Sequence, residues 1–274
     1  MPIKVTPFEG PLGAEISGLD IRAISPDDAR ALNEAFLQYH VIVLRDQKPT
    51  DQQLVDFGKS FGEIKKSRFI SPLSGHDQIM VISNIREDGK PLGQLPDGEM
   101  WFHIDQIYTA QPCRGAALHA LEIPSEGGDT CFSNNVLAYE TLPDQTKRRL
   151  EGLTAQHSFQ YGATTVGAKQ DENRPHYTHP LVRRIPDTGK RSISICRLMT
   201  DRINELPEEE SRALISELCD HVEDPKFVYQ HKWRIGDILV WDNRCTSHAR
   251  TDFSETERRF MKRVTIADKD IPMA

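Results

Sequence analysis

The feature of this sequence that most restricts its fold is a series of short apolar or alternating segments that begins near Gln78. Glycine, proline, asparagine and aspartate residues separate the segments, as is typical of turns between strands. The predicted strands are residues 79–83, 115–121, 192–196, 226–233, 237–242 and 260–267. The tripeptide Ile235-Gly236-Asp237 predicts a tight turn between two of them. Many short strands at this spacing predict an all-β sandwich or barrel core.

The N-terminal part of the chain carries helix signals instead. Ser25, followed by a proline and two acids, fits a helix N-cap. One helical face then collects four apolar residues, which are Leu32, Ala35, Phe36 and Tyr39. The apolar run at residues 41–44 predicts a buried strand. Thr50 and Gln53 form a capping-box pattern for a second helix, which Gly62 is expected to end.

Two further segments complete the predicted organisation. A helix is expected within residues 207–221, because proline and acidic residues stand at its start. Residues 160–190 are rich in Gly, Thr, Arg and Pro and show little periodicity, so they fit an insertion or a lid. No segment has the composition of a linker. We therefore expect one domain over residues 1–274, with an α-helical N-terminal layer on a β core.

Composition limits the functions that this chain can serve. The formal net charge is −7, which argues against a dedicated nucleic-acid binder because such proteins need a basic face. No secretory signal and no membrane-spanning apolar run is visible. The five cysteines show no C-x-x-C spacing and fit reduced thiols rather than disulfides or a zinc site. A cytoplasmic location is the expectation.

The pair His103 and Asp105 is the first candidate for metal chemistry. In an extended segment, residues two apart point to the same side, so the imidazole and the carboxylate could bind one ion. The spacing alone is a weak signal, because His221 and Glu223 show it too. That second pair follows a helical pattern, where residues two apart do not face each other, so it is expected to hold no metal.

A second block supplies a third ligand and two arginines. The strand pattern at 237–242 runs into a polar turn that ends at His248. Two imidazoles and one carboxylate form the ligand set of non-haem Fe(II) oxygenases. Arg259 and Arg263 share one face of the next predicted strand, about 13 Å apart at the usual rise. They indicate either an anion-binding pocket or a solvated face, and the spacing does not decide between these.

Other conspicuous residues have structural interpretations. His119 lies in an apolar run and is expected in the core or behind the metal ligands. His176 and His179 are three apart near a proline, and His179 is expected to have a structural role rather than to bind a metal. His231 and Trp233 are expected on an exposed or half-buried strand. Trp101 and its neighbour Phe102 fit either a pocket wall or core packing.

At this point the sequence resembles the taurine dioxygenase and 2,4-dichlorophenoxyacetate dioxygenase family of Fe(II)- and 2-oxoglutarate-dependent oxygenases. The resemblance covers nearly the whole chain. The shared motifs, in order, are LGAEISGLD, VIVLRDQ, FGE at 61–63, WFHID at 101–105, GGDT at 127–130, HPLVR at 179–183, WDNRCTSH at 241–248 and RRFMKRVTI at 258–266. The family fold that this implies is a double-stranded β-helix, a jelly-roll core with helices packed outside.

The resemblance also implies roles for single residues. The metal ligands would be His103, Asp105 and His248. Thr130 and Arg259 would bind the far carboxylate of 2-oxoglutarate, and Arg263 would face an anionic group of the prime substrate. The implied reaction is hydroxylation with O₂, which releases succinate and CO₂. The implied assembly is a homo-oligomer, either a dimer or a tetramer.

The match departs from taurine dioxygenase near the FGE motif. The taurine enzyme has a sulfonate-binding histidine there, whereas this chain has Lys65, Lys66 and Arg68. These basic residues are either alternative anion contacts or solvated loop residues. A small organic anion of the sulfonate, sulfate ester or aryloxyalkanoate type is therefore expected, with C–S, C–O or C–N cleavage as a net outcome. A zinc hydrolase on the same three ligands and a non-catalytic jelly-roll binding protein are the alternatives.

Overall fold

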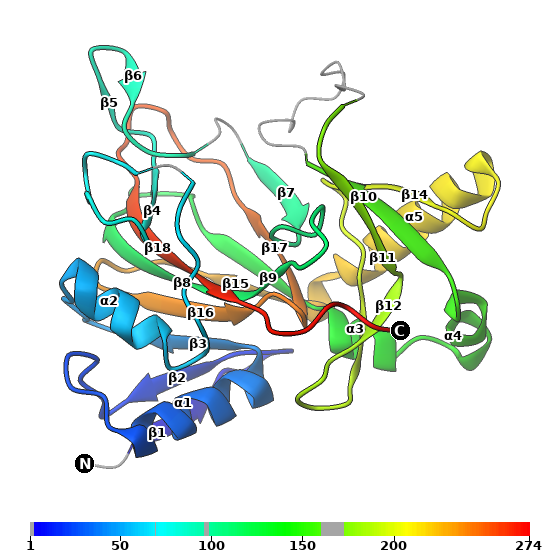
Figure 1. Cartoon of the computed structure of the whole chain (residues 1–274), viewed down its shortest axis with the longest axis horizontal. Coiled ribbons are helices and arrows are strands. Elements are labelled where there is room, and N and C mark those ends of the chain that lie inside the picture. Colours follow the sequence, from blue (N-terminus) through cyan, green and yellow to red (C-terminus); the bar gives the residue numbers. More distant parts are fainter. Residues whose placement is uncertain (1–2, 69, 96–98, 160–172) are drawn as a thin grey trace.

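Two antiparallel β-sheets form the centre of the molecule (Figure 1). The computed structural model describes residues 3–68, 70–95, 99–159 and 173–274. The strands of the seven-stranded major sheet are, in spatial order, β1 (Lys4–Pro7), β2 (Ala14–Ser17), β3 (Val41–Leu44), β16 (Ile238–Asp242), β8 (Cys113–Glu122), β18 (Phe260–Ala267) and β4 (Met80–Ser83). The minor sheet contains β15 (Val228–His231), β9 (Thr130–Asn134), β17 (Thr246–Arg250) and β7 (Met100–His103). The one parallel pairing in these sheets joins β2 to β3.

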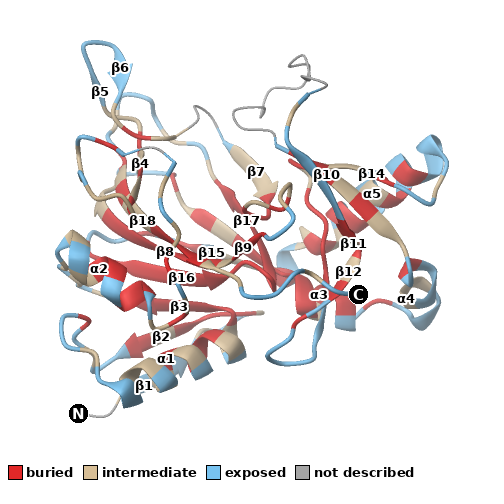
Figure 2. Cartoon of the chain, viewed as in Figure 1, coloured by how far each residue is buried: buried red, intermediate tan, exposed pale blue. Residues whose placement is uncertain are grey.

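The inner faces of the two sheets share one apolar core. From the major sheet, Leu118, Trp241 and Met261 point into it, and from the minor sheet Phe132 meets them. The rings of Phe132 and Trp241 lie 5.7 Å apart. Figure 2 shows that the central strands β8, β9, β16 and β17 are buried over most of their length. The two facing sheets, with helices outside them, confirm the predicted jelly-roll core.

Two helices cover the outer face of the major sheet. The first, α1 (Pro26–Tyr39), begins with the predicted cap, since Ser25 and Asp28 form a capping box. The second, α2 (Asp51–Gly58), begins with a capping box of Thr50 and Gln53. Together with residues of the sheet, both helices bury a large aliphatic and aromatic cluster.

The predicted end of α2 was wrong. The helix ends at Gly58, and turns carry the chain to Gly62. Phe61 packs from these turns, with its ring 5.3 Å from that of Phe36 and 5.5 Å from that of Phe57. Phe61 thus has the spacing of a residue on the helix face but lies in the turn after the helix. Its packing against Phe36 and Phe57 holds that turn in the core.

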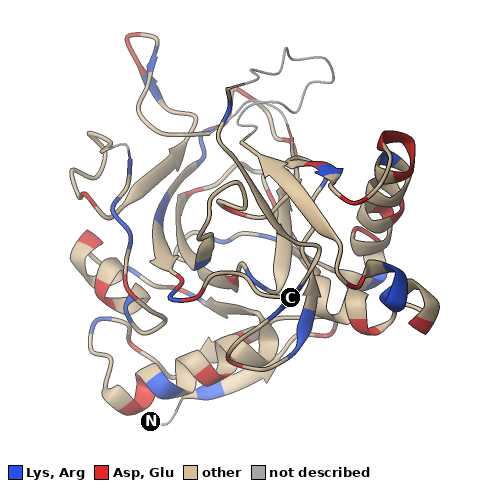
Figure 3. Ribbon diagram, turned by 45° about the vertical axis from the view of Figure 1, so that its right-hand side comes forward, with Lys and Arg blue, Asp and Glu red and all other residues tan. Residues whose placement is uncertain are grey.

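A second group of elements lies beside the two sheets. It contains α3 (Asn135–Glu140), α4 (Asp144–Leu150), α5 (Glu208–Val222) and the strands β10 (Thr154–Ser158), β11 (His176–Pro180), β12 (Val182–Arg184), β13 (Arg191–Ile193) and β14 (Thr200–Ile203). They enclose their own apolar cluster. Three glutamates open α5 and three basic residues close α4, and the two helices lie at the same end of the molecule (Figure 3).

The structure corrects the prediction for residues 160–190. Residues 160–172 lie outside the described residues, whereas 176–180 and 182–184 form β11 and β12 rather than a lid. The strand predicted at 192–196 is shorter, since β13 ends at Ile193. A small hairpin of β5 (Arg86–Glu87) and β6 (Lys90–Pro91) completes the described strands.

The predicted turn at residues 235–237 is present but joins different sheets. A short 3₁₀ helix, Pro225–Phe227, leads into β15, and the turn closes through the amide of Asp237 and the carbonyl of Arg234, 3.0 Å apart. β15 belongs to the minor sheet and β16 to the major one, so this is no hairpin.

The described residues contain no helix long and apolar enough to cross a membrane.

Candidate active site

A cavity of about 710 Å³ opens between the major and minor sheets. His103, Asp105 and His248 lie in its wall, together with the predicted anion-binding residues. The six residues with a predicted role come from four strands and two loops, so no single segment forms the site. The structure thus brings together every residue for which the sequence predicted a role.

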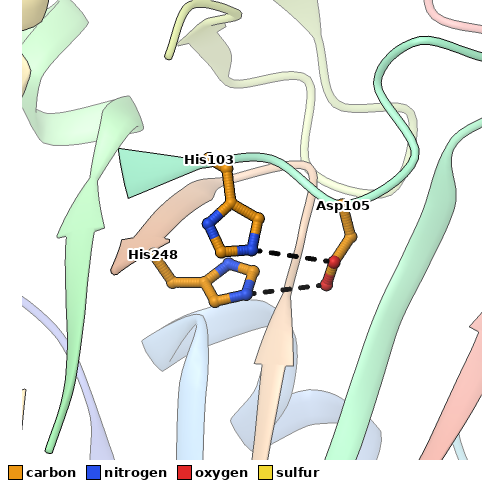
Figure 4. A group of neighbouring side chains, drawn as sticks. All are labelled: His103, Asp105 and His248. Atoms are coloured by element: carbon orange, nitrogen blue, oxygen red, sulfur yellow. Dashed lines mark ion pairs between the residues drawn. The ribbon is translucent and has the colours of Figure 1, made fainter. Parts of the chain in front are cut away.

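The three candidate metal ligands converge on one point (Figure 4). His103 ends β7, and His248 lies directly opposite it on β17. Asp105 approaches from the loop after β7, with its two carboxylate oxygens 4.0 Å from His103 Nε2 and 3.7 Å from His248 Nε2. One ligand atom of each residue lies within 4.8 Å of the others. This mixed nitrogen and oxygen set suits a divalent transition metal such as Fe(II) and leaves positions open toward the cavity.

The protonation states favour metal binding. Burial lowers the pKa of His103, and burial with the neighbouring His103 lowers that of His248, so both imidazoles are neutral near pH 7. Burial would raise the pKa of Asp105, but Arg263 and the two histidines outweigh it and hold that pKa below its usual range. His103 Nδ1 lies 3.0 Å from the Trp101 carbonyl, which orients Nε2 toward the other ligands.

Asp105 is held in place through its backbone. The side-chain oxygen of Asn243 accepts from the Asp105 amide at 2.8 Å, and its nitrogen donates to the Asp105 carbonyl at 3.0 Å. The same nitrogen donates to the Cys113 carbonyl at 2.9 Å. The Asn243 side chain therefore fixes the backbone of Asp105 on both sides and joins it to the start of β8. The next residue, Gln106, has a φ of +56°, which fits a chain that turns sharply after the ligand.

A buried polar network supports the turn that contains Asn243. Asp242 accepts two hydrogen bonds from the Arg244 guanidinium, at 2.9 and 2.8 Å. Arg183, in the HPLVR run, donates to the carbonyls of Arg244 and Asn243 at 2.9 and 2.6 Å. Since these charges and carbonyls are buried, their mutual satisfaction is what allows the turn to lie inside the protein.

Arg263 lies beside the candidate metal ligands rather than at the mouth of the cavity. Its guanidinium donates to both oxygens of Asp105, at 3.2 and 2.7 Å, and lies 5.3 Å from the ring centroid of Trp241. The alternative that this arginine lies on a solvated face was therefore wrong. The guanidinium balances the charge of the carboxylate in this buried site.

Arg259 and Thr130 line another part of the cavity. Arg259 is 2% exposed, and no described acidic side chain lies within ion-pair distance of its guanidinium. Burial, with Arg250 nearby, lowers the pKa of Arg259 to about 9. Asp129 acts on Arg259 only from beyond ion-pair distance. A buried guanidinium without a directly paired carboxylate is unfavourable, so this end of the cavity suits an anionic ligand. The solvated-face alternative for Arg259 was wrong as well.

Sequence reasoning missed three residues of the site. Arg250 lines the cavity opposite Thr130 in the register of β9 and β17. Its spacing of two from His248 was a signal for it, because alternate residues of a strand share a face. Asn243 and Trp233 contact the site from behind, and their spacing carries no such signal.

The basic residues after the FGE motif lie at the cavity, with different partners. Lys65 donates to the Gln106 side chain at 2.9 Å. Lys66 pairs with Asp77 at 2.8 Å, and its side chain is largely exposed. Arg68 also lines the cavity. Lys66 is thus mainly solvated, whereas the anion contact of Lys65 or Arg68 stays a prediction.

The histidines that were set aside lie away from the three ligands. His119 is buried and contacts the Gln47 carbonyl at 3.2 Å, and His179 contacts the Thr109 carbonyl at 2.9 Å. His221 lies on α5 as predicted and contacts the Ala138 carbonyl. His231 ends β15, which is half-buried as predicted, because Gln230 is exposed and His231 is buried. Trp233 lies beyond that strand, and the side chains of His231 and Trp233 are both buried, at 0% and 8% exposed.

The aromatic residues beside the metal motif were given two interpretations. Trp101 packs against a buried cluster that includes Ile104 and Leu198. Its indole donates to Glu99 at 2.8 Å. Neither Trp101 nor Phe102 is among the residues that line the cavity, so core packing describes Trp101 better.

Comparison with known proteins identifies relatives over the whole chain. The family model for taurine catabolism dioxygenase TauD, TfdA family, matches residues 4–265. The chain is 35% identical to Pentalenolactone F synthase of Streptomyces arenae, covering 96% of this chain and 94% of the relative. It is 31% identical to the alpha-ketoglutarate-dependent 2,4-dichlorophenoxyacetate dioxygenase of Burkholderia sp. (strain RASC), covering 89% and 86%. The crystal structure of AAD-2 in complex with Mn(II) and N-oxalylglycine superimposes with a TM-score of 0.85 at 28% identity, covering 100% of both chains.

The role of Asn243 in placing Asp105 leads to a prediction for metal affinity. Asn243→Ala should weaken Mn(II) binding by about ten- to hundredfold, because the Asp105 backbone loses both hydrogen bonds from the Asn243 side chain. Electron paramagnetic resonance of free Mn(II) during a titration measures this. Ser247→Ala is the matched control, since Ser247 is buried on the other face of β17 and donates to Asn135 at 3.2 Å. Equal Mn(II) affinities in the two variants would contradict the prediction.

Proposed function

Because this chain belongs to the taurine catabolism dioxygenase TauD, TfdA family and is a 2-oxoglutarate-dependent dioxygenase, we propose that His103, Asp105 and His248 bind its Fe(II) ion. We further propose that Arg259 and Thr130 bind the far carboxylate of 2-oxoglutarate. The observation that carries this proposal is the pairing of two features in one cavity. A compact His-Asp-His cluster lies in the same wall as a buried arginine that has no acidic partner among the described residues.

The chemistry supplied by bound Fe(II) with O₂ is the oxidation of 2-oxoglutarate to succinate and CO₂, coupled to insertion of one oxygen atom into a substrate C–H bond. The protein contributes position and exclusion of water. Neutral imidazoles and an ionised carboxylate are ready to bind a cation without losing protons. Arg259 and Thr130 hold the cosubstrate at its far end, and the two sheets keep bulk water from the reacting atoms.

We propose that the prime substrate is a small organic anion with an apolar body. The cavity wall is mainly apolar and includes several flexible thioether and aliphatic side chains, which are Met80, Ile82, Leu95, Met100, Leu118, Leu198 and Met199. Arg263 and Arg68 supply positive charge in the same cavity. Sulfonates, sulfate esters and aryloxyalkanoates combine both properties. Hydroxylation next to a heteroatom would give an unstable product, so C–S, C–O or C–N cleavage would follow.

The zinc hydrolase alternative fits the ligands but leaves the Arg259 end of the cavity without a role. The non-catalytic alternative leaves the complete ligand set without a role.

We also propose that residues 1–274 form one domain that acts in the cytoplasm, where the five described cysteines would stay unpaired as they are here. A homo-oligomer, either a dimer or a tetramer, is the assembly we propose.

A spectroscopic titration tests the metal site. Anaerobic addition of Fe(II) and 2-oxoglutarate should produce a weak visible charge-transfer band, which His103→Ala should abolish because one of three protein ligands is lost. His119→Gln serves as the control, since His119 is a buried histidine outside the cavity. A wild-type protein that shows no band and retains zinc tightly would contradict the proposed Fe(II) site.

Steady-state kinetics test the anion end of the cavity. Arg259→Ala removes a charge-assisted contact worth about 1.5–3 kcal/mol, so the KM for 2-oxoglutarate should rise about tenfold or more. Arg258→Ala is the neighbouring control, because Arg258 is exposed and pairs with Glu122 at 2.6 Å. An unchanged KM in Arg259→Ala would reject the proposed role.

A substrate panel tests the proposed charge preference. Succinate formation should be triggered by aryloxyalkanoates, alkyl sulfates or alkyl sulfonates that carry an apolar body, and less well by taurine, which lacks one. The methyl ester or amide of each carboxylate provides an uncharged control of nearly the same shape. Turnover of the uncharged compounds at equal rates would show that the cavity does not select an anion.

A further inference from the structure

Trp233 lies directly behind Thr130, on the side away from the cavity. Its indole Nε1–H donates to the Thr130 hydroxyl oxygen over 3.0 Å, and the two residues are 8% and 6% exposed. Thr130 lines the cavity together with Arg259, whereas Trp233 does not reach it. The contact therefore connects a residue outside the cavity to a hydroxyl at its wall.

This hydrogen bond determines the direction in which the Thr130 hydroxyl can donate its proton. An indole N–H only donates, so the hydroxyl oxygen must accept. Its proton is then directed elsewhere, and no described residue accepts it. Arg259, which shares this part of the cavity, also only donates. Arg259 and the Thr130 hydroxyl therefore each present a donor hydrogen to a ligand at this end of the cavity.

A buried chain of contacts holds the indole in place. The ring of His231 meets that of Trp233 edge-on, with centroids 4.6 Å apart and planes at 86°. Asp237 accepts from His231 Nε2 at 3.1 Å, which leaves His231 Nδ1 to accept from the Tyr229 hydroxyl at 2.9 Å. Arg45 pairs with the same Asp237 oxygen at 2.5 Å. Because each partner is fixed by another, the indole has little freedom to turn away from Thr130.

We propose that Trp233 is a positioning residue that directs the Thr130 O–H proton toward the ligand, and so makes the cosubstrate pocket favour a terminal carboxylate over the corresponding amide. The inference rests on the proposed binding of 2-oxoglutarate by Thr130 and Arg259. A carboxylate accepts from both residues. The amide of 2-oxoglutaramate would place an NH₂ group against donors on at least one side. Without the indole, the hydroxyl could rotate and accept from that NH₂ group.

Calorimetric titration of 2-oxoglutarate into the Mn(II)-loaded protein tests this without turnover. Thr130→Val should weaken binding about tenfold or more, and Trp233→Phe about three- to tenfold. The double variant should bind no more weakly than Thr130→Val alone, because both changes act through one hydroxyl. Trp233→Phe should also reduce the preference for 2-oxoglutarate over 2-oxoglutaramate, which a loss of packing alone would not do.

Phe57→Leu is the control for lost aromatic packing, since Phe57 is buried in α2 away from the cavity. It should lower the urea midpoint of unfolding and leave the affinity for 2-oxoglutarate unchanged. If Trp233→Phe does not fold, the indole Nε1–H resonance of Trp233 in Zn(II)-loaded protein replaces it. That resonance should shift on addition of 2-oxoglutarate in the wild-type protein and should not shift in Thr130→Val.

The possible failures can be told apart. Unchanged affinity in Thr130→Val would overturn the proposed cosubstrate contact, and the inference with it. Weaker binding in Thr130→Val, combined with an unaffected or fully additive Trp233→Phe, would overturn only the role of Trp233. An indole resonance that shifts equally in the wild-type protein and Thr130→Val would do the same.

Discussion

The hydrogen bonds of the Asn243 side chain are the interaction on which the arrangement of this site depends. They join the turn between β16 and β17 to the backbone of Asp105, over a separation of 138 residues in the sequence. The turn itself is buried, so its polar groups must find partners inside the protein. Arg183 and Arg244 supply them. The chain can therefore pass from the major to the minor sheet beside the cavity and deliver His248 opposite His103.

The cavity separates two electrostatic environments. Near the metal ligands, the carboxylate of Asp105 already has a cationic partner in Arg263. A bound divalent cation and this guanidinium would share one carboxylate, which keeps Asp105 ionised whether or not metal is present. Around Arg259 positive charge is in excess, because Arg250 and Arg259 line the cavity there and no described carboxylate pairs with Arg259. The cavity thus suits a ligand that chelates a metal at one end and carries a negative charge at the other.

A second buried network supports the donor end of the cavity, as the Asn243 turn supports the metal end. The contacts from Arg45 through Asp237 to His231 end at the indole of Trp233. His231, Trp233 and Asp237 lie at or next to the turn between β15 and β16, and Arg45 reaches Asp237 from the end of β3. The two ends of one cavity are therefore held by two separate polar networks, and each lies in a connection between the major and minor sheets.

The sequence by itself determined the helices with their caps, most strand positions and the three converging ligands, because these depend on local spacing and on motifs at family-like intervals. The tertiary structure alone decided that Arg263 contacts Asp105, that Asn243 and Trp233 contact the site from behind, and that His231 and Trp233 are buried. Each of these contacts joins segments that meet only through strand register and sheet packing. Local periodicity shows which face a residue occupies, but it carries no information on what lies opposite that face.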